Sequence, residues 1–168
     1  MPNGADHGLH GLPLPEGDWR YSHRFLAALD AAAAMHAAQV RKETAVPYVA
    51  HPLAVCSLVM EHGGDEEEAI AALLHDVIED CDVLDDYLAV RFPDPICDMV
   101  DALTKQVGED YESFLRRVVK TPGAMLVKEA DIADNYGRLH QLQDAATRER
   151  LKLKYESALK ILEELSKQ

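Results

Sequence analysis

An apolar stripe with a helical period runs through the middle of the chain and constrains the fold more than any other feature. Its members recur at the spacing i, i+3, i+4, i+7, i+8 and i+11, as Ile70, Leu73, Leu74, Val77, Ile78 and Cys81. A repeat of about 3.6 residues places such side chains on one face of an α-helix, whereas a strand would require alternation. We therefore predict one amphipathic helix over residues 65–81 that packs this face against a core.

The same period recurs along most of the chain. Proline stands at the expected first helical position in His51-Pro52, Asp94-Pro95 and Thr121-Pro122, where its missing N–H would lack a partner anyway. No segment alternates convincingly as a strand would. The fold class is therefore predicted to be all-α, a compact bundle of about eight helices over residues 21–40, 51–63, 65–81, 84–92, 94–103, 111–119, 121–139 and 147–165.

Length and local composition predict the domain organisation. A chain of 168 residues with 48% apolar residues is large enough for one hydrophobic core. Residues 1–17 carry four glycines and three prolines, a composition that favours a flexible N-terminal tail. We expect that tail to precede a single domain over residues 18–168.

Several features point to a cytoplasmic protein. No run of about 18 apolar residues occurs, so a membrane span is not expected. The start of the sequence lacks a basic segment followed by an apolar one, so no secretory signal is expected. The three cysteines, Cys56, Cys81 and Cys97, form no CxxC pair, which favours reduced thiols over disulfides or a structural zinc site.

The charge balance limits the partners of the chain. A formal net charge of −13 repels a polyanion, so general binding of nucleic acid is disfavoured. A small phosphorylated substrate requires only a local basic cluster or a metal ion, and it stays compatible with this charge. The sequence leaves the oligomeric state open, a homo-oligomer included.

The predicted helix over residues 65–81 also carries the polar residues best suited to chemistry. His75, Asp76, Glu79 and Asp80 lie together on the arc opposite its apolar stripe. An imidazole and a carboxylate can converge on one cation, and further carboxylates can orient water or accept a proton. A solvated acidic face is an equally good interpretation of this helix alone, although acidic groups in its last turn oppose the helix dipole.

A second polar row lies on the predicted helix over residues 121–139. Lys128, Asp131 and Asn135 follow the spacing i, i+3 and i+7 and combine a cation, a carboxylate and an amide on one face. Taken alone, a surface ion pair is the better interpretation of this row. Likewise, His51 taken alone is better interpreted as structural than as a ligand.

Two further features near the first helix allow two interpretations each. Arg41-Lys42 is either a solvated loop or a clamp for phosphate. His36 lies among apolar residues, where a buried histidine that forms hydrogen bonds is favoured over a metal ligand.

Taken together, the motifs resemble those of the HD-domain phosphohydrolases, and most closely the hydrolase domain of RelA/SpoT-type alarmone enzymes and their small stand-alone relatives. Their order and spacing agree over about residues 25–140. A PYxxHP motif followed by HDxxED is a specific combination, whereas a bare His-Asp pair would be weak. The motifs are Arg41-Lys42, Pro47-Tyr48-Val49-Ala50-His51-Pro52, Leu74-His75-Asp76-Val77-Ile78-Glu79-Asp80, Leu103-Thr104-Lys105, and Val127-Lys128 with Ala130-Asp131 and Asn135.

The resemblance implies an all-α bundle of the HD-domain type that binds a divalent metal, Mn²⁺. The family's ligand positions correspond to His51, His75, Asp76 and Asp131. Two nitrogen and two carboxylate ligands suit a divalent transition metal with open positions.

The resemblance also implies roles around the metal. Glu79 and Asp80 correspond to the acidic pair that assists attack by water. The positions expected to face the nucleotide substrate are Arg41, Lys42, Thr104, Lys128 and Asn135.

Four residues beside these motifs depart from the family pattern. Cys81 stands where the family usually has Thr, and Glu129 stands where an apolar residue is usual. Ile132 replaces a frequent Arg or Lys, and Asp134 replaces a frequent His or Tyr. These changes bear on substrate identity more than on metal binding.

Three functional hypotheses follow from these motifs. The first is hydrolysis of the 3′-pyrophosphate of (p)ppGpp. The second is hydrolysis of another nucleotide or phosphorylated metabolite, which the changes at Cys81, Glu129 and Ile132 favour. The third is a non-catalytic module that binds metal and nucleotide, favoured by the negative charge of Glu129 and opposed by the intact Glu79-Asp80 pair.

Overall fold

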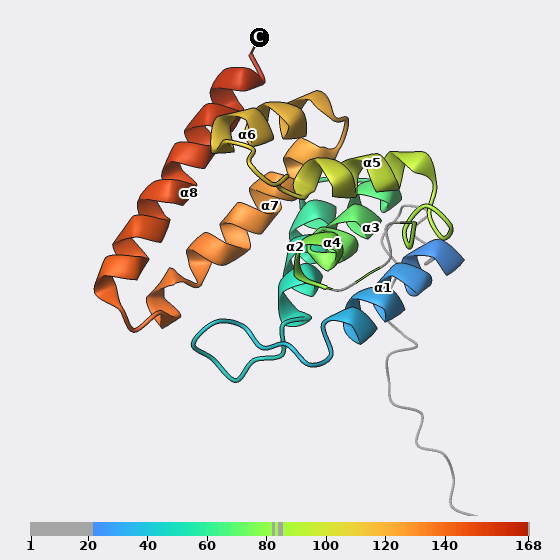
Figure 1. Ribbon diagram of the computed structural model, residues 1–168, viewed down its shortest axis with the longest axis horizontal. Coiled ribbons are helices and arrows are strands. Elements are labelled where there is room, and N and C mark those ends of the chain that lie inside the picture. Colours follow the sequence, from blue (N-terminus) through green and yellow to red (C-terminus); the bar gives the residue numbers. More distant parts are fainter. Residues whose placement is uncertain (1–21, 82, 84–85, 168) are drawn as a thin grey trace, which may run out of the picture.

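The computed structural model describes residues 22–81, 83 and 86–167, and these residues form helices joined by loops, among them a long one over residues 36–49 (Figure 1). Within them no β-strand occurs, and a single isolated bridge joins Val40 to Pro47. The predicted all-α fold is therefore confirmed, whereas the expected tail over residues 1–17 lies outside the described part. The helices are α1 (His23–Met35), α2 (Ala50–Glu61), α3 (Glu66–Leu74), α4 (Val77–Asp80), α5 (Asp94–Leu103), α6 (Tyr111–Lys120), α7 (Ala124–Gly137), the 3-10 helix η1 (Leu139–Gln141) and α8 (Ala145–Leu165).

Helix α3 forms the centre of the molecule, surrounded by α1, α2, α5 and α7 (Figure 1). It begins with a reciprocal capping box, in which the Asp65 side chain accepts from the Glu68 N–H and the Glu68 side chain accepts from the Asp65 N–H. Every residue from Ala69 to Leu74 is fully buried. A helical segment that is apolar on all sides belongs in a core, and residues 69–74 of α3 fill that position.

The predicted single helix over residues 65–81 is interrupted, and this prediction was wrong in its second half. His75 and Asp76 form a turn between α3 and the short α4. The His75 ring bonds back to the Ala72 carbonyl, and the Tyr48 hydroxyl donates to Asp76. After the turn, Ile78 is 40% exposed rather than buried. The periodicity of one segment gives no information about the Tyr48–Asp76 hydrogen bond, whose two residues are 28 positions apart.

Other helix boundaries also differ from the prediction. Helix α1 ends at Met35 rather than near residue 40, because the chain beyond it turns and pairs Val40 with Pro47. The helix predicted over residues 84–92 is wrong for the part described, since residues 86–91 form turns. Leu88 and Phe92 are both buried, so two core contacts four residues apart imitated a helical period.

Helix α7 begins at Ala124, two residues later than the proline signal suggested. Gly123 precedes it with a φ of 81°, a backbone conformation that favours glycine, so Thr121-Pro122 belongs to a turn. Helix α8 returns beside α7 and packs on α6 and α7 through its buried residues Ala158 and Leu162. Among the described helices, none has both the length and the apolar character that crossing a membrane requires.

Candidate metal centre

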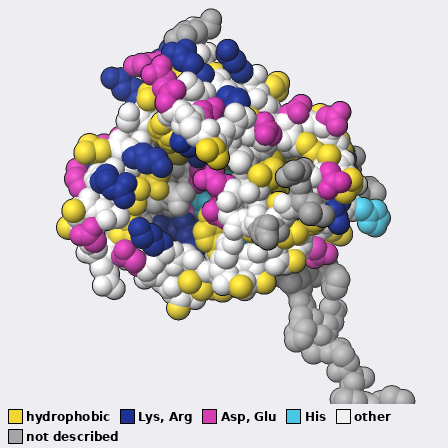
Figure 2. Space-filling model, viewed as in Figure 1, with side chains coloured by type: hydrophobic (Ala, Val, Ile, Leu, Met, Phe, Trp, Pro, Cys, Tyr) yellow, Lys and Arg dark blue, Asp and Glu magenta, His cyan; other side chains and the backbone are white. Residues whose placement is uncertain are grey.

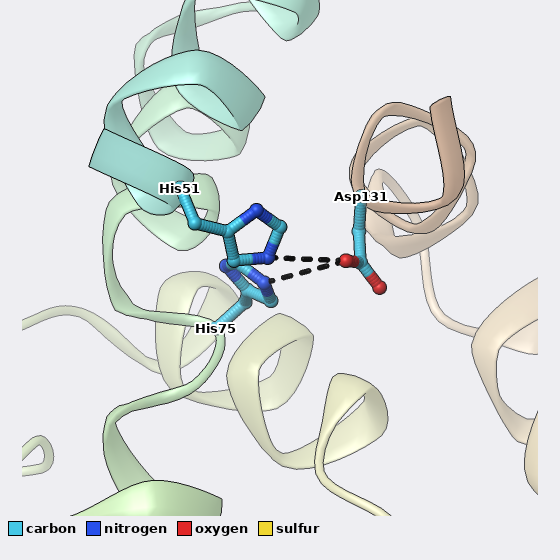
Figure 3. Close-up of side chains that lie close together, drawn as sticks. All are labelled: His51, His75 and Asp131. Atoms are coloured by element: carbon cyan, nitrogen blue, oxygen red, sulfur yellow. Dashed lines mark ion pairs between the residues drawn. The ribbon is translucent and has the colours of Figure 1, made fainter. Parts of the chain in front are cut away.

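Three buried side chains from three separate segments of the chain meet between α2 and α7. His51 lies in the first turn of α2, His75 follows the end of α3, and Asp131 lies in the middle of α7. Their exposed fractions are 2%, 3% and 7%. The Nε2 atoms of His51 and His75 lie 3.2 Å and 3.9 Å from the same oxygen, Oδ1 of Asp131 (Figure 3). These three residues form a group that could hold a metal ion, because one ligand atom from each lies within 4.8 Å of the others.

Asp76, the fourth predicted ligand, lies against the same group. Its Oδ2 is 3.2 Å from Nε2 of His75 and 3.4 Å from Nε2 of His51. The same oxygen accepts a hydrogen bond of 2.7 Å from the Tyr48 hydroxyl. The sequence predicted a continuous helix that would place Asp76 beside His75. The turn after α3 places it there instead.

The chemistry of this group fits a divalent cation. Nε2 of His75 is buried and faces oxygens of Asp76 and Asp131 at 3.2 Å and 3.9 Å without a well-aligned hydrogen bond, although a buried polar atom normally has one. The opposite ring nitrogen, Nδ1, bonds to the Ala72 carbonyl at 2.8 Å, which holds Nε2 toward the carboxylates. Burial lowers the pKa of His75, but Asp76 and Asp131 outweigh burial and raise it to about 9. A cation at this point would replace that proton and provide the missing partner.

Asp131 is held on both oxygens by its neighbours on α7. Lys128 Nζ donates to Oδ2 at 2.7 Å, and Asn135 Nδ2 donates to Oδ1 at 2.6 Å. Burial raises the pKa of Asp131, yet Lys128 and the two histidines keep it well below its usual value. The carboxylate is therefore ionised and fixed in direction, as a ligand to a cation requires.

A cleft of about 230 Å³ opens from this group, and the predicted acidic pair lies at its edge. Glu79 and Asp80 are exposed on α4 and line the cleft together with His51, Asp76 and Asp131. Both carboxylates can therefore contact water or a ligand in the cleft.

A second hollow of about 290 Å³ continues the first and is lined by basic residues. The two share Tyr48, Asn135 and Tyr155 as walls. Figure 2 shows the blue Lys and Arg side chains gathered around a hollow with magenta acidic groups beside it. The basic residues that line the two hollows are Arg41, Lys42, Lys105, Lys128, Arg138, Arg150 and Lys154.

The structure places the predicted substrate residues in different surroundings. Lys42 is exposed and lines the second hollow, whereas Arg41 is buried and donates to Asp134 and Asn135. Thr104 does not line either hollow, and its hydroxyl donates to the Val100 carbonyl. Its neighbours Leu103 and Lys105 do line the first hollow.

The four residues His51, His75, Asp76 and Asp131 are called the metal group below. Other residues singled out from the sequence lie away from it. His36 is buried and its Nδ1 lies 2.7 Å from the Gln39 side chain, as expected of a structural histidine. Glu129 lines neither hollow, and Cys81 lies beside Met35 and His36.

Sequence reasoning missed several residues of the cleft. Tyr48 was quoted only as part of a motif, and Asp134 only as a departure, although both contact residues of the metal group. Arg150 and Lys154 come from α8, and their charge alone gave no sign that they face the cleft. Only the packing of α8 beside α7 brings them there.

Comparison with known proteins identifies the family. Residues 28–163 match the family described as the HD domain. This chain is a member of the HD-domain family. The expected relation of this HD-domain chain to SpoT-type hydrolase domains is also confirmed.

Curated relatives of this HD-domain chain include two bacterial proteins. A guanosine-3′,5′-bis(diphosphate) 3′-pyrophosphohydrolase of Aquifex aeolicus is 32% identical over 124 residues, which cover 69% of this chain and 18% of the relative. The bifunctional (p)ppGpp synthase/hydrolase SpoT of Escherichia coli is 30% identical over 142 residues, covering 77% and 20%. The chain thus spans about a fifth of the length of these relatives.

A solved structure resembles this HD-domain chain over most of both chains. Its title describes a metazoan ortholog of SpoT that hydrolyzes ppGpp and plays a role in starvation responses. The TM-score is 0.71 at 27% sequence identity, and the alignment covers 86% of each chain. A small protein of similar extent therefore shares this fold.

Proposed function

We propose that this chain is a metal-dependent hydrolase of the 3′-pyrophosphate of (p)ppGpp. The observation that carries the proposal is the His51–His75–Asp131 group in a cleft that continues into a second hollow, with Lys and Arg side chains lining both. A cation site beside clustered Lys and Arg side chains suits a substrate that bears several phosphate groups. The named activities of the SpoT-type relatives and of the metazoan protein support the same substrate.

In this proposal His51, His75, Asp76 and Asp131 hold one divalent ion, with Mn²⁺ as the native metal. When bound, such an ion supplies Lewis-acid charge that polarises phosphate oxygens and favours the ionisation of water. Mixed imidazole and carboxylate ligands are compatible with Mn²⁺.

Glu79 and Asp80 act on the water that attacks. Their exposed carboxylates at the cleft edge orient a water molecule and accept its proton as the new bond to phosphorus forms. The bond between that phosphorus and the 3′ oxygen breaks, pyrophosphate leaves, and the 3′ oxygen takes a proton to become a hydroxyl.

Basic and amide groups hold the substrate in place. Lys42 and Lys105 are exposed in the two hollows and are free to approach phosphate groups. Lys128 and Asn135 hold Asp131 and also face the cleft. The substrate-binding roles of Arg41 and Thr104 follow from the resemblance and stay predictions.

The test is the release of pyrophosphate from ppGpp by the purified protein with Mn²⁺. We expect turnover in the wild-type protein and none above background in a His75→Ala, Asp76→Ala double variant. Absence of turnover in a wild-type protein that binds Mn²⁺ would exclude this substrate.

A second candidate is a phosphatase that acts on a different nucleotide or phosphorylated metabolite. It is favoured by the apolar Ile132 in the cleft and by Asp134, which engages Arg41 and reduces the positive charge offered to a ligand. A panel of phosphorylated compounds distinguishes the two, since this candidate releases inorganic phosphate rather than pyrophosphate.

The third hypothesis, a non-catalytic binding module, loses its motive because Glu129 lines neither hollow. The expected cytoplasmic location and oligomeric state stay predictions.

A further inference from the structure

The carboxylate of Asp134 on α7 lies between the metal group and the basic hollow, and it contacts both. Its Oδ2 lies 2.8 Å from Nδ1 of His51 and accepts from Nη1 of Arg41. Its Oδ1 accepts from Nε of Arg138 at 3.1 Å. The side chain is only 7% exposed. This carboxylate is thus surrounded by three nitrogen donors.

Helix α7 contacts both nitrogens of the His51 ring. Asp131 Oδ1 lies 3.2 Å from Nε2, and Asp134, one turn further along, accepts from Nδ1 at 2.8 Å. A histidine that donates from one nitrogen to a carboxylate has its proton fixed there, which leaves the other nitrogen bare for a metal. The Asp134 contact therefore selects the tautomer and the ring direction that a ligand at His51 Nε2 requires.

The same carboxylate also limits the motion of Arg41. The guanidinium is buried and donates to Asp134 through Nη1 and to Asn135 through Nη2 at 3.1 Å. Asn135 in turn donates to Asp131. A continuous set of hydrogen bonds therefore joins the basic hollow to two residues of the metal group.

Packing alone does not account for this arrangement. A carboxylate removed from water costs free energy unless it is paired and fully bonded, and its cationic neighbours offset that cost.

We propose that Asp134 is a positioning residue that fixes His51 for metal binding and Arg41 beside the substrate. The proposal rests on the metal centre of the proposed function. It states that one carboxylate, Asp134, links the metal group to the basic hollow. Asp134 lines neither hollow, so in this proposal it acts through His51 and Arg41.

The experiment measures Mn²⁺ affinity and kinetics in three variants. Asp134→Asn keeps the size of the side chain but removes the charge, and we expect Mn²⁺ to bind about 10-fold to 100-fold more weakly by titration calorimetry. Arg41→Gln keeps the contact between His51 and Asp134, so Mn²⁺ affinity should change less than threefold while KM rises. Asp30→Asn, at an exposed position on α1, is the matched control and should change neither quantity.

A second measurement covers the case in which Asp134→Asn fails to fold. Long-range ¹H–¹⁵N correlation spectra of the wild-type protein report which nitrogen of each histidine carries a proton. With a diamagnetic divalent ion such as Zn²⁺ bound, we expect Nδ1 of His51 to be protonated and Nε2 to be bare, with His51→Gln assigning the signal. A bare Nδ1 would overturn the proposal.

The outcomes separate this inference from the proposed function. If Asp134→Asn binds Mn²⁺ as tightly as the wild-type protein, Asp134 is not a positioning residue. That result does not bear on whether the wild-type protein hydrolyses ppGpp. If Asp134→Asn weakens Mn²⁺ but the wild-type protein does not hydrolyse ppGpp, the inference stands and the substrate assignment fails.

Discussion

The two ends of the cleft are built in different ways. At the metal end, His51, His75 and Asp131 are buried and held by side-chain or backbone partners behind them. At the basic end, Lys42 and Arg150 are exposed side chains on the surface. Long exposed side chains retain rotamer freedom, whereas bonded buried ones do not. We infer that the metal end is preorganised and that the basic end adapts to its ligand.

This difference has a consequence for substitutions. A change at the metal end removes a group whose partners are then left buried without compensation, so its effect on binding and stability is large. A change at the basic end removes a charge that water and salt already screen, so its effect is small and depends on ionic strength.

The largest effect is expected at the shared carboxylate of the metal end. Asp131→Asn removes the charge that faces His51, His75 and Lys128, so we expect Mn²⁺ affinity to fall at least 100-fold. The half-buried Lys128 loses its anionic partner, which costs about 3 kcal/mol of unfolding free energy. Calorimetric titration and chemical denaturation measure the two effects. Unchanged Mn²⁺ occupancy would remove Asp131 from the ligand set, provided circular dichroism shows the helices intact.

The acidic pair at the cleft edge should separate chemistry from metal binding. We expect Glu79→Gln with Asp80→Asn to lower kcat by about 100-fold to 10,000-fold, because general-base assistance is lost. Both residues are exposed, so Mn²⁺ affinity and thermal stability should change little. Steady-state kinetics alongside Mn²⁺ titration checks this. A variant that keeps wild-type kcat would exclude a role in proton transfer.

Tyr48 tests whether a side chain that holds a ligand, without being a ligand itself, affects Mn²⁺ affinity. Tyr48→Phe removes the hydroxyl that donates to Asp76, and we expect Mn²⁺ affinity to fall about 10-fold. The ring still packs against His36, so unfolding free energy should fall by only about 1 kcal/mol. Tyr87→Phe, at a site that lines neither hollow, is the control. Equal Mn²⁺ affinity in wild type and Tyr48→Phe would show that Asp76 needs no such support.

The smallest effects are expected at the basic end. Lys42→Ala or Arg150→Ala should raise KM about twofold to tenfold at low salt with kcat nearly constant, and the difference should shrink as salt is added. Lys120→Ala, at an exposed position on α6 that lines neither hollow of the cleft, is the matched control. A salt-independent loss of kcat in either variant would contradict the contrast between the two ends.

The sequence predicted those features that local pattern controls. The all-α fold and the burial of Ile70, Leu73 and Leu74 follow from the helical period. Periodicity failed where long-range contacts decide the backbone, as at the turn of His75 and Asp76. It failed again between Leu88 and Phe92, where two core contacts imitate a helix.

For the candidate site, the motifs predicted the members of the metal group better than their surroundings. Residues of three separate segments were expected to meet, and His51, His75, Asp76 and Asp131 do lie together. No local pattern placed Lys154 or Arg150 at the cleft, because their position depends on how α8 packs against α7. Nor could spacing reveal that Arg41 is engaged by a carboxylate 93 residues away.

The most direct test of the metal centre is anomalous diffraction at the manganese edge from crystals of the protein loaded with Mn²⁺. We predict one strong peak within bonding distance of His51 Nε2, His75 Nε2 and a carboxylate oxygen of both Asp76 and Asp131. A peak elsewhere, or none there at saturating Mn²⁺, would contradict it.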